Sequence, residues 1–113
     1  MEAELYDEEL YNYKAQVIKA MAHPSRLMMI DALSNGELCV CELQEIVGSD
    51  MSTVSKHLSV LRNAGIVTSR KEGLQVYYKL LVPCILGFLN CVDEVLNQNA
   101  KTRMDVLEAA SSR

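Results

Sequence analysis

The chain has 113 residues, of which 50% are hydrophobic and 23% are charged, and its net charge is −4. This is the composition of an ordinary soluble protein with one modest core. No apolar run is long enough to span a bilayer and the acidic N-terminus argues against a secretory signal, so we expect a cytoplasmic protein with no membrane partner.

The charge is unevenly distributed along the chain. Residues 1–50 hold three Lys/Arg against ten Asp/Glu, whereas residues 51–73 hold four Lys/Arg against one Glu. The local field, rather than the net charge, is what a phosphate backbone would meet. Acidity overall therefore does not exclude nucleic acid as a partner.

The first half of the chain has the apolar spacing of helices. The spacing predicts an amphipathic helix over 5–21. Pro24 suits the first turn of a second helix, which Asn35-Gly36 would end. A short third helix is marked by Leu43, Ile46 and Val47. A fourth helix over 51–64 has an apolar face of Val54, Leu58 and Leu61.

The second half begins with a change of period. Alternation over 75–80 predicts a strand, which can pair with 66–70 across a turn near Glu72-Gly73. Pro83 opens a last helical region, which Asn97 to Asn99 are expected to weaken or end before residues 101–110. The sequence thus predicts a single domain over 1–113, mainly α with a small β-hairpin: a winged helix-turn-helix. Residues 24–80 form its core and wing, and helices 5–21 and 83–110 serve for dimerisation.

The polar face of the fourth helix is a candidate for DNA reading. It carries Ser52, Thr53, Ser55, Lys56 and Ser59. Short hydroxyls at a helix N-terminus reach phosphates or base edges without bulk, and Lys56 adds a phosphate contact. At the hairpin tip, Arg70 and Lys71 suit the minor groove or the backbone. The alternative is a solvated polar face with no partner.

Cys39 and Cys41 form a second candidate site. On a regular helix, residues two apart point about 200° from one another, but on an extended segment they share a face. The pair lies at the entry to the third helix, after Asn35-Gly36, where we expect the backbone to be partly extended, and a helix N-terminus favours thiolate. Two thiolates suit As(III), Sb(III), Cd(II), Pb(II) or Cu(I). Chelation would distort the first turn of the third helix and misplace the fourth on DNA. The alternative is that both are small buried apolar residues.

Cys84 and Cys91 are seven residues apart and so lie on one face of the last helix. Packing in a dimer interface is one interpretation. The others are a third thiolate for the Cys39/Cys41 site, or a second site for trivalent arsenic or for redox chemistry. Their Cα separation of about 10.5 Å in a straight helix is too long for a disulfide within that helix.

Four segments follow one another in a specific order and spacing. They are Ala22-His23-Pro24-Ser25-Arg26, Glu37-Leu38-Cys39-Val40-Cys41-Glu42-Leu43, Ser52-Thr53-Val54-Ser55-Lys56-His57-Leu58 and Leu61-Arg62-Asn63-Ala64-Gly65. Over about residues 22–80 the chain resembles the ArsR/SmtB family of metal-responsive repressors. The resemblance implies a homodimer that occupies double-stranded operator DNA until an inducer binds. It also implies a wing from Arg70 to Gln75, and a position in or near the major groove for Ser52, Thr53, Ser55, Lys56 and His57.

The thiol pair departs from the patterns of that family. The three-thiol arsenic site would have a cysteine where Gln44 stands, and the cadmium/lead branch takes cysteines from an N-terminal arm, whereas residues 1–38 hold none. The zinc branch uses His and carboxylates of the C-terminal helix, where Asp93 and Glu94 are present but no His follows His57. A third ligand must come from elsewhere, or the inducer needs two thiolates, as a monomethylated trivalent arsenical does.

The sequence therefore predicts a repressor that releases its operator when a thiophilic ion binds Cys39 and Cys41. Trivalent arsenic is the first candidate inducer, with Cys84 and Cys91 as candidate additional thiolates and no organic cofactor. Alternatives are a Cd/Pb-responsive repressor, a thiol redox or persulfide switch of the same fold, and a metal-buffering protein. An enzyme is disfavoured because there is no Cys-x-x-Cys motif, no phosphate loop and no base placed near a nucleophile.

Overall fold

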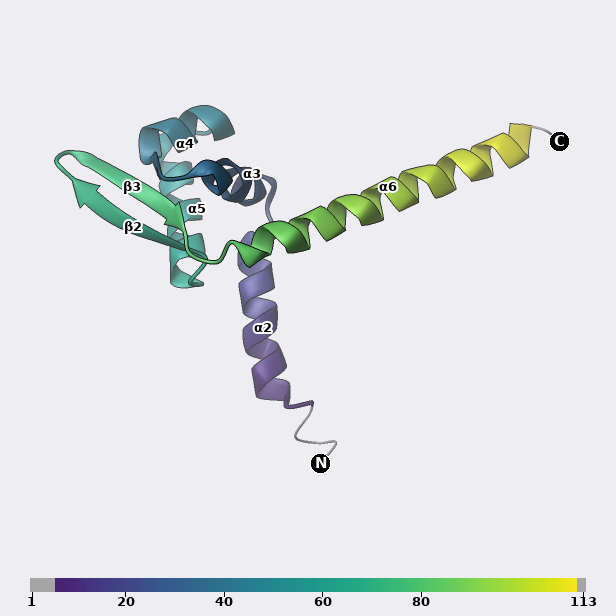
Figure 1. Ribbon diagram of the computed structural model, residues 1–113, viewed down its shortest axis with the longest axis horizontal. Helices are drawn as coiled ribbons and strands as arrows, with labels where there is room; N and C mark the ends of the chain where they lie inside the picture. The colour runs from purple at the N-terminus through teal and green to yellow at the C-terminus, as the bar shows by residue number, and fades with distance from the viewer. Residues whose placement is uncertain (1–5, 112–113) are drawn as a thin grey trace. The chain divides into compact units, whose positions relative to one another are not determined.

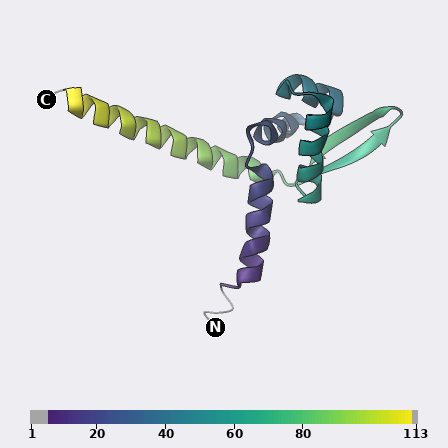
Figure 2. The same ribbon diagram turned by 180° about the vertical axis from the view of Figure 1, so that it is seen from behind.

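The computed structural model describes residues 6–111 and divides into two units, separated between Val82 and Pro83 (Figures 1 and 2). Each unit is described by itself. In the first, the helices are α2 (Glu8–Met21), α3 (Pro24–Ala32) with the short 3-10 turn η1 (Leu33–Asn35), α4 (Val40–Val47) and α5 (Met51–Asn63). Along the part of the chain that is described, no helix combines the length and the apolar character needed to cross a membrane.

Side chains at the helix starts explain where these helices begin. The Asp7 carboxylate accepts a hydrogen bond from the Glu9 amide at 3.0 Å, and Nδ1 of His23 accepts one from the Ser25 amide at 3.1 Å. Pro24 occupies the first turn of α3, where its missing N–H costs nothing. At the other end, Gly48 closes α4 with φ +77°, a left-handed conformation that glycine adopts without a Cβ penalty.

The core lies where α3, α4 and α5 meet the sheet. The residues with less than 2% exposure are Met29, Ile30, Leu43, Val54, Leu58, Leu61, Ile66 and Val67. The face predicted for the fourth helix is therefore confirmed. In α4, Leu43 is the buried residue, whereas Ile46 is 49% exposed.

A three-stranded antiparallel sheet has the order β1-β3-β2. Its strands are β1 (Leu38–Cys39), β2 (Val67–Glu72) and β3 (Gln75–Leu80). The β2–β3 hairpin, called the wing below, closes through the two residues Gly73 and Leu74, with Gly73 at φ +62°. The hairpin extends away from the helices in both views (Figures 1 and 2). Strand β1 was not predicted, although an extended backbone at Cys39 was.

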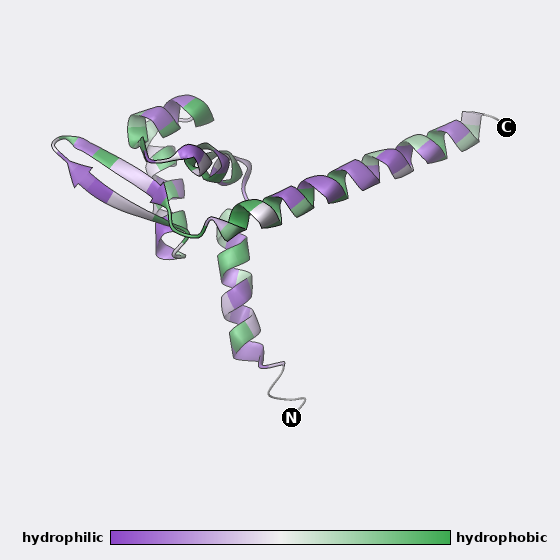
Figure 3. Ribbon diagram, in the orientation of Figure 1, coloured by the Kyte–Doolittle hydropathy of each residue, from purple (hydrophilic) through white to green (hydrophobic). Residues whose placement is uncertain are grey.

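The second unit is the helix α6 (Cys84–Ser111). It runs without interruption through Asn97–Asn99, so the prediction of a break there is wrong. Asparagine is only a mediocre helix former, and its propensity cost is small against the continuous hydrogen-bond ladder on both sides. None of its residues is buried within the chain, and apolar residues recur along it (Figure 3).

These elements form a winged helix-turn-helix, which confirms the predicted fold class: α4, the turn at Gly48 and α5, followed by the wing. The predicted helix 5–21 is found from Glu8, and its predicted first residue lies outside the described part of the chain. The single-domain description over 1–113 stays a prediction.

Candidate DNA interface and thiol site

Helix α5 presents a polar face opposite its buried residues. Ser52, Ser55 and Lys56 are exposed, while Thr53 and Ser59 are partly buried. All five belong to the predicted DNA-reading face, and the amphipathic helix keeps the three exposed ones clear of the core. Hydroxyl and ammonium groups on an exposed helix face are suited to phosphate oxygens and to base edges in a major groove.

The N-terminus of α5 is capped by a carboxylate of the protein itself. Asp50 accepts a hydrogen bond from the Thr53 amide at 2.7 Å. This hydrogen bond and one from Ser52 lower the pKa of the Asp50 carboxyl. The negative charge of Asp50 repels a phosphate at this end of α5. It therefore offsets the favourable interaction expected between a helix N-terminus and a phosphate.

His57 does not belong to the exposed face of α5, and its position in or near the major groove stays a prediction. The side chain is 9% exposed and its ring lies 4.3 Å from that of His23, centroid to centroid. The Nε of Arg26 donates a hydrogen bond to Nδ1 of His57 at 3.0 Å. His57 thus ties α5 to the start of α3.

In the wing, Arg70 is engaged by two carboxylates. Its Nε and Nη2 each donate to Glu37 at 2.8 Å, and its Nη1 donates to Glu72 at 2.8 Å. The guanidinium also lies over the Tyr77 ring, 4.7 Å from the centroid. These hydrogen bonds raise the pKa of Arg70, and the Arg70 guanidinium lowers the pKa of Glu37. Arg70 therefore has partners within the protein, although its side chain remains exposed.

The tip of the wing is formed by other residues. Leu74 is 98% exposed. Lys71 and Gln75, both predicted to contact DNA, are exposed on the two strands beside the turn. Among the predicted wing residues, the structure thus leaves Lys71 and Gln75 accessible and gives Arg70 partners within the protein.

The two N-terminal thiols lie where β1 passes into α4. Cys39 has extended backbone, φ −79° and ψ 163°, and stands immediately before the helix, whereas Cys41 lies in its first turn. The Glu42 carboxylate accepts a hydrogen bond from the Cys39 amide at 3.1 Å. Hydrogen bonds from Cys39 lower the pKa of Glu42. Cys39 therefore has extended backbone, as expected, whereas Cys41 has helical backbone.

Both thiols are accessible to a ligand to different degrees. Cys39 is partly buried and Cys41 is exposed, and both are free. Cys41 Sγ lies 3.9 Å from Oε1 of Gln75, within reach of a weak S–H···O hydrogen bond to the wing. The pair therefore lies where α4 begins, and its member Cys41 also contacts the wing.

No third ligand accompanies the pair. In residues 6–111 there is no group of three or more His, Cys, Asp and Glu side chains able to hold a metal ion. Cys84 and Cys91 are exposed, free residues of α6 in the second unit. Their assignment as additional thiolates stays a prediction.

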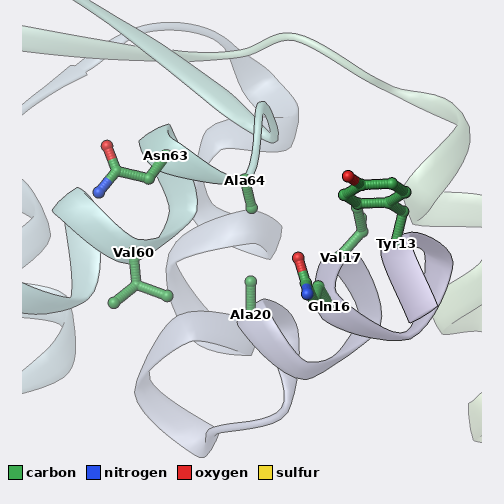
Figure 4. A pocket seen from close by; sticks show the side chains of 7 residues that line it. All are labelled: Tyr13, Gln16, Val17, Ala20, Val60, Asn63 and Ala64. Carbon is green, nitrogen blue, oxygen red and sulfur yellow. The ribbon is translucent and has the colours of Figure 1, made fainter. Parts of the chain in front are cut away.

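A separate hollow of about 450 Å³ lies between α2 and the end of α5 (Figure 4). It is lined by Tyr13, Gln16, Val17, Ala20, Val60, Asn63 and Ala64. None of these is a thiol, so the hollow and the Cys39/Cys41 site are distinct.

Two residues of the thiol site were missed by the sequence reasoning. Glu42 stands three residues after Cys39, the spacing of a capping box, which would have placed the start of α4 at Val40. Glu37 stands two residues before Cys39, so an extended chain puts both on one face. Its partner Arg70 is 33 residues away, and no local pattern indicates that pairing.

Comparison with known proteins finds a matching family model and similar transcription regulators. Residues 23–69 match the family model described as "Bacterial regulatory protein, arsR family". An HTH-type transcriptional regulator of Methanocaldococcus jannaschii is 36% identical over 88 residues, covering 77% of this chain and 99% of the relative. A cadmium resistance transcriptional regulatory protein CadC homolog of Staphylococcus aureus is 46% identical over 67 residues, covering 58% and 55% of the two chains.

A solved structure extends the similarity to three dimensions. The homodimeric winged helix-turn-helix DNA-binding domain of Mb0332 from Mycobacterium bovis aligns with a TM-score of 0.71 at 28% identity. The alignment covers 85% of this chain and 89% of that one.

Proposed function

Because this chain belongs to the ArsR family of bacterial regulatory proteins, which are DNA-binding transcription regulators and not enzymes, we propose that it is a repressor released from its operator by a thiophilic inducer. The inducer binds Cys39 and Cys41, and trivalent arsenic is our first candidate. One observation carries the proposal: two free thiols lie where β1 passes into α4, the first helix of the helix-turn-helix.

The chemistry of the pair suits trivalent arsenic. When arsenous acid binds two thiols, two As–O bonds are replaced by two As–S bonds, and the thiol protons leave in two molecules of water. No electron is transferred, so the step needs no oxidant or reductant. Soft thiolate ligands select such thiophilic acceptors over hard cations. A monomethylated trivalent arsenical has the same requirement for two sulfurs and is an equal candidate.

DNA recognition is assigned to α5 and the wing. Ser52, Thr53, Ser55, Lys56 and Ser59 face the major groove, and Lys71 and Gln75 approach the neighbouring backbone. Helix α4 packs against α5, so a change in the first turn of α4 reaches the reading helix through their shared core. A coupling of about 1–3 kcal/mol between the two sites suffices for induction.

The working form is a homodimer on a palindromic operator in the cytoplasm. Support comes from the homodimeric Mb0332 domain and from the apolar residues that α2 and α6 leave exposed, among them Tyr13, Ile18, Phe88 and Leu96. A dimer places two reading helices in successive major grooves.

The test is fluorescence anisotropy of the reduced protein on its own upstream DNA, titrated with arsenite, monomethylarsonous acid, Cd(II), Pb(II) and Zn(II). We expect an arsenical to weaken DNA binding by about 5–150-fold. Cys39→Ser and Cys41→Ser should bind DNA but lose this response, and the same titration of Cys84→Ser and Cys91→Ser identifies any third thiolate. Tight DNA binding that ignores every ion would refute the proposal.

A second candidate is a thiol redox or persulfide switch, favoured by the lack of a third ligand among the described residues. It predicts release of DNA by hydrogen peroxide or sulfane sulfur, reversal by dithiothreitol, and indifference to arsenicals. A Cd- or Pb-responsive repressor would respond in the same titration to those ions instead.

A further inference from the structure

Glu37, Cys39, Tyr77 and Arg70 lie together on one face of the small sheet. In the strand register, Cys39 of β1 is opposite Tyr77 of β3, and Tyr77 is opposite Arg70 of β2. Residues opposite one another on neighbouring strands have their side chains on the same face. The adjacent row, through Leu38, Tyr78 and Ser69, turns the other way, and Tyr78 is 7% exposed. The row with Cys39 is therefore the outer one.

Contacts within this outer row join the thiol segment to the wing. Glu37 binds Arg70 through two donors at 2.8 Å, and Arg70 lies 4.7 Å above the Tyr77 ring. Glu37 stands just before β1 and precedes Cys39 by two residues, so a shift of Cys39 is passed to Glu37 through the short backbone between them. A bidentate arginine–carboxylate pair fixes orientation as well as distance. Cys41 also contacts Gln75, which is the first residue of β3 after the turn of the wing.

We propose that Glu37 is the positioning residue through which occupancy of the thiols reaches the wing. With free thiols, Glu37 holds Arg70 and fixes the wing beside α5. A ligand that joins Cys39 to Cys41 draws Cys39 out of line with Tyr77, Glu37 moves with it, and Arg70 loses its bidentate partner. The inference rests on the proposed thiol ligand, but it adds a route to DNA that does not pass through α4 and α5.

Glu72 provides a matched control. It also accepts a hydrogen bond from Arg70 at 2.8 Å, but it belongs to the wing itself and not to the thiol segment. Glu37→Gln and Glu72→Gln each remove one negative charge beside the same guanidinium. Their effects on DNA affinity through net charge are therefore alike, and only Glu37→Gln breaks the connection to Cys39.

The experiment uses the full chain carrying Cys84→Ser and Cys91→Ser, so that Cys39 and Cys41 are the remaining thiols. The probe is phenylarsine oxide, which forms two As–S bonds and releases one water. Three quantities are measured: the free thiols, the NMR resonance of the Arg70 Nε–H without DNA, and the DNA dissociation constant by anisotropy. With Glu37 present, we expect loss of both thiols, a shifted Arg70 resonance and DNA binding weakened by about tenfold or more.

In Glu37→Gln, both thiols should still react, but the Arg70 resonance should not respond and the DNA response should be about threefold or more smaller than in the parent. Glu72→Gln should respond as the parent does. Thiols that react in the parent with no change at Arg70, or equal responses in the two variants, would overturn this inference alone. Thiols that do not react would refute the proposed function and this inference with it.

Discussion

Arg26 and His57, 31 residues apart, are joined by a hydrogen bond of 3.0 Å from the guanidinium Nε to the imidazole Nδ1. The same guanidinium donates through Nη1 to the carbonyl of Ala20 at 3.2 Å. Three elements thus meet at one side chain: the end of α2, the start of α3 and the reading helix α5. Because Nδ1 accepts from a permanent cation, the ring must be without a proton at that atom, and its protonation breaks the connection.

This arrangement predicts a pH dependence of stability. Burial, followed by the charges of His23 and Arg26, lowers the pKa of His57 below its ordinary 6.5. As the pH falls, His57 is therefore protonated in the unfolded chain before it is protonated in the folded protein. The stability that this difference provides is fully present above about pH 6.5 and is lost as the pH falls through the lower pKa of His57 in the folded protein. The free energy of unfolding in urea, measured from pH 8 to pH 5, should fall in the wild type. His57→Gln should be flatter, and an unchanged pH profile in that variant would contradict this assignment.

Lys56 is predicted to contribute one phosphate contact. Lys56→Ala should weaken binding to operator and to unrelated DNA by similar factors and reduce the slope of log affinity against log salt by about 1. Anisotropy at several salt concentrations gives both quantities. Lys101→Ala, an exposed lysine of α6, is the control that should leave the slope unchanged. A loss confined to the operator would instead indicate a base contact.

Asp50 is predicted to limit DNA affinity while stabilising α5. Asp50→Asn keeps a side-chain acceptor for the Thr53 amide and removes the charge, so its stability should be close to that of the wild type and its DNA binding tighter at low salt. Asp50→Ala should lose about 0.5–2 kcal/mol of unfolding free energy. Thermal unfolding and anisotropy on the same samples separate the two effects. Weaker DNA binding by a stably folded Asp50→Asn would show that the carboxylate assists recognition.

Leu43 and Ile46 provide a test of which face of α4 supports the reading helix. Leu43 is fully buried and Ile46 is 49% exposed. Leu43→Ala should cost about 2–5 kcal/mol, and Ile46→Ala should cost less than about 1 kcal/mol because much of its side chain is already in water. Urea unfolding measures both. Equal losses would mean that Ile46 is covered in the working assembly, for example by a second copy.

The sequence predicted what depends on local periodicity. Helix α5 was predicted because Val54, Leu58 and Leu61 repeat with the helical period. That same period places His57 on the inner face, beside Leu58, so spacing alone predicts that its side chain is buried. The resemblance to a known family instead implied a position near DNA. The sequence does not predict the continuity of α6, because asparagine lowers helix propensity but does not by itself end a helix.

The candidate site was predicted less completely, because its connections are long-range. The extended backbone at Cys39 was expected from its place before a helix, but β1 is formed only by pairing with β3 across 38 residues of chain. The bidentate contact of Arg70 to Glu37 likewise depends on that sheet. From the sequence alone, a basic residue in a hairpin has no visible partner within the protein. The sequence therefore predicts a DNA contact for Arg70 and does not predict its contact with Glu37.

The turn of the wing has only two residues, Gly73 and Leu74, and β3 lies between β2 and β1. A single inserted or deleted residue in this turn would exchange the faces of Tyr77 and Tyr78 if β3 shifted to restore pairing with β2. The aromatic ring beneath Arg70 would enter the core, and the buried one would face water. The length of this turn and the pairing of β3 therefore decide together which tyrosine supports Arg70 and which one fills the core.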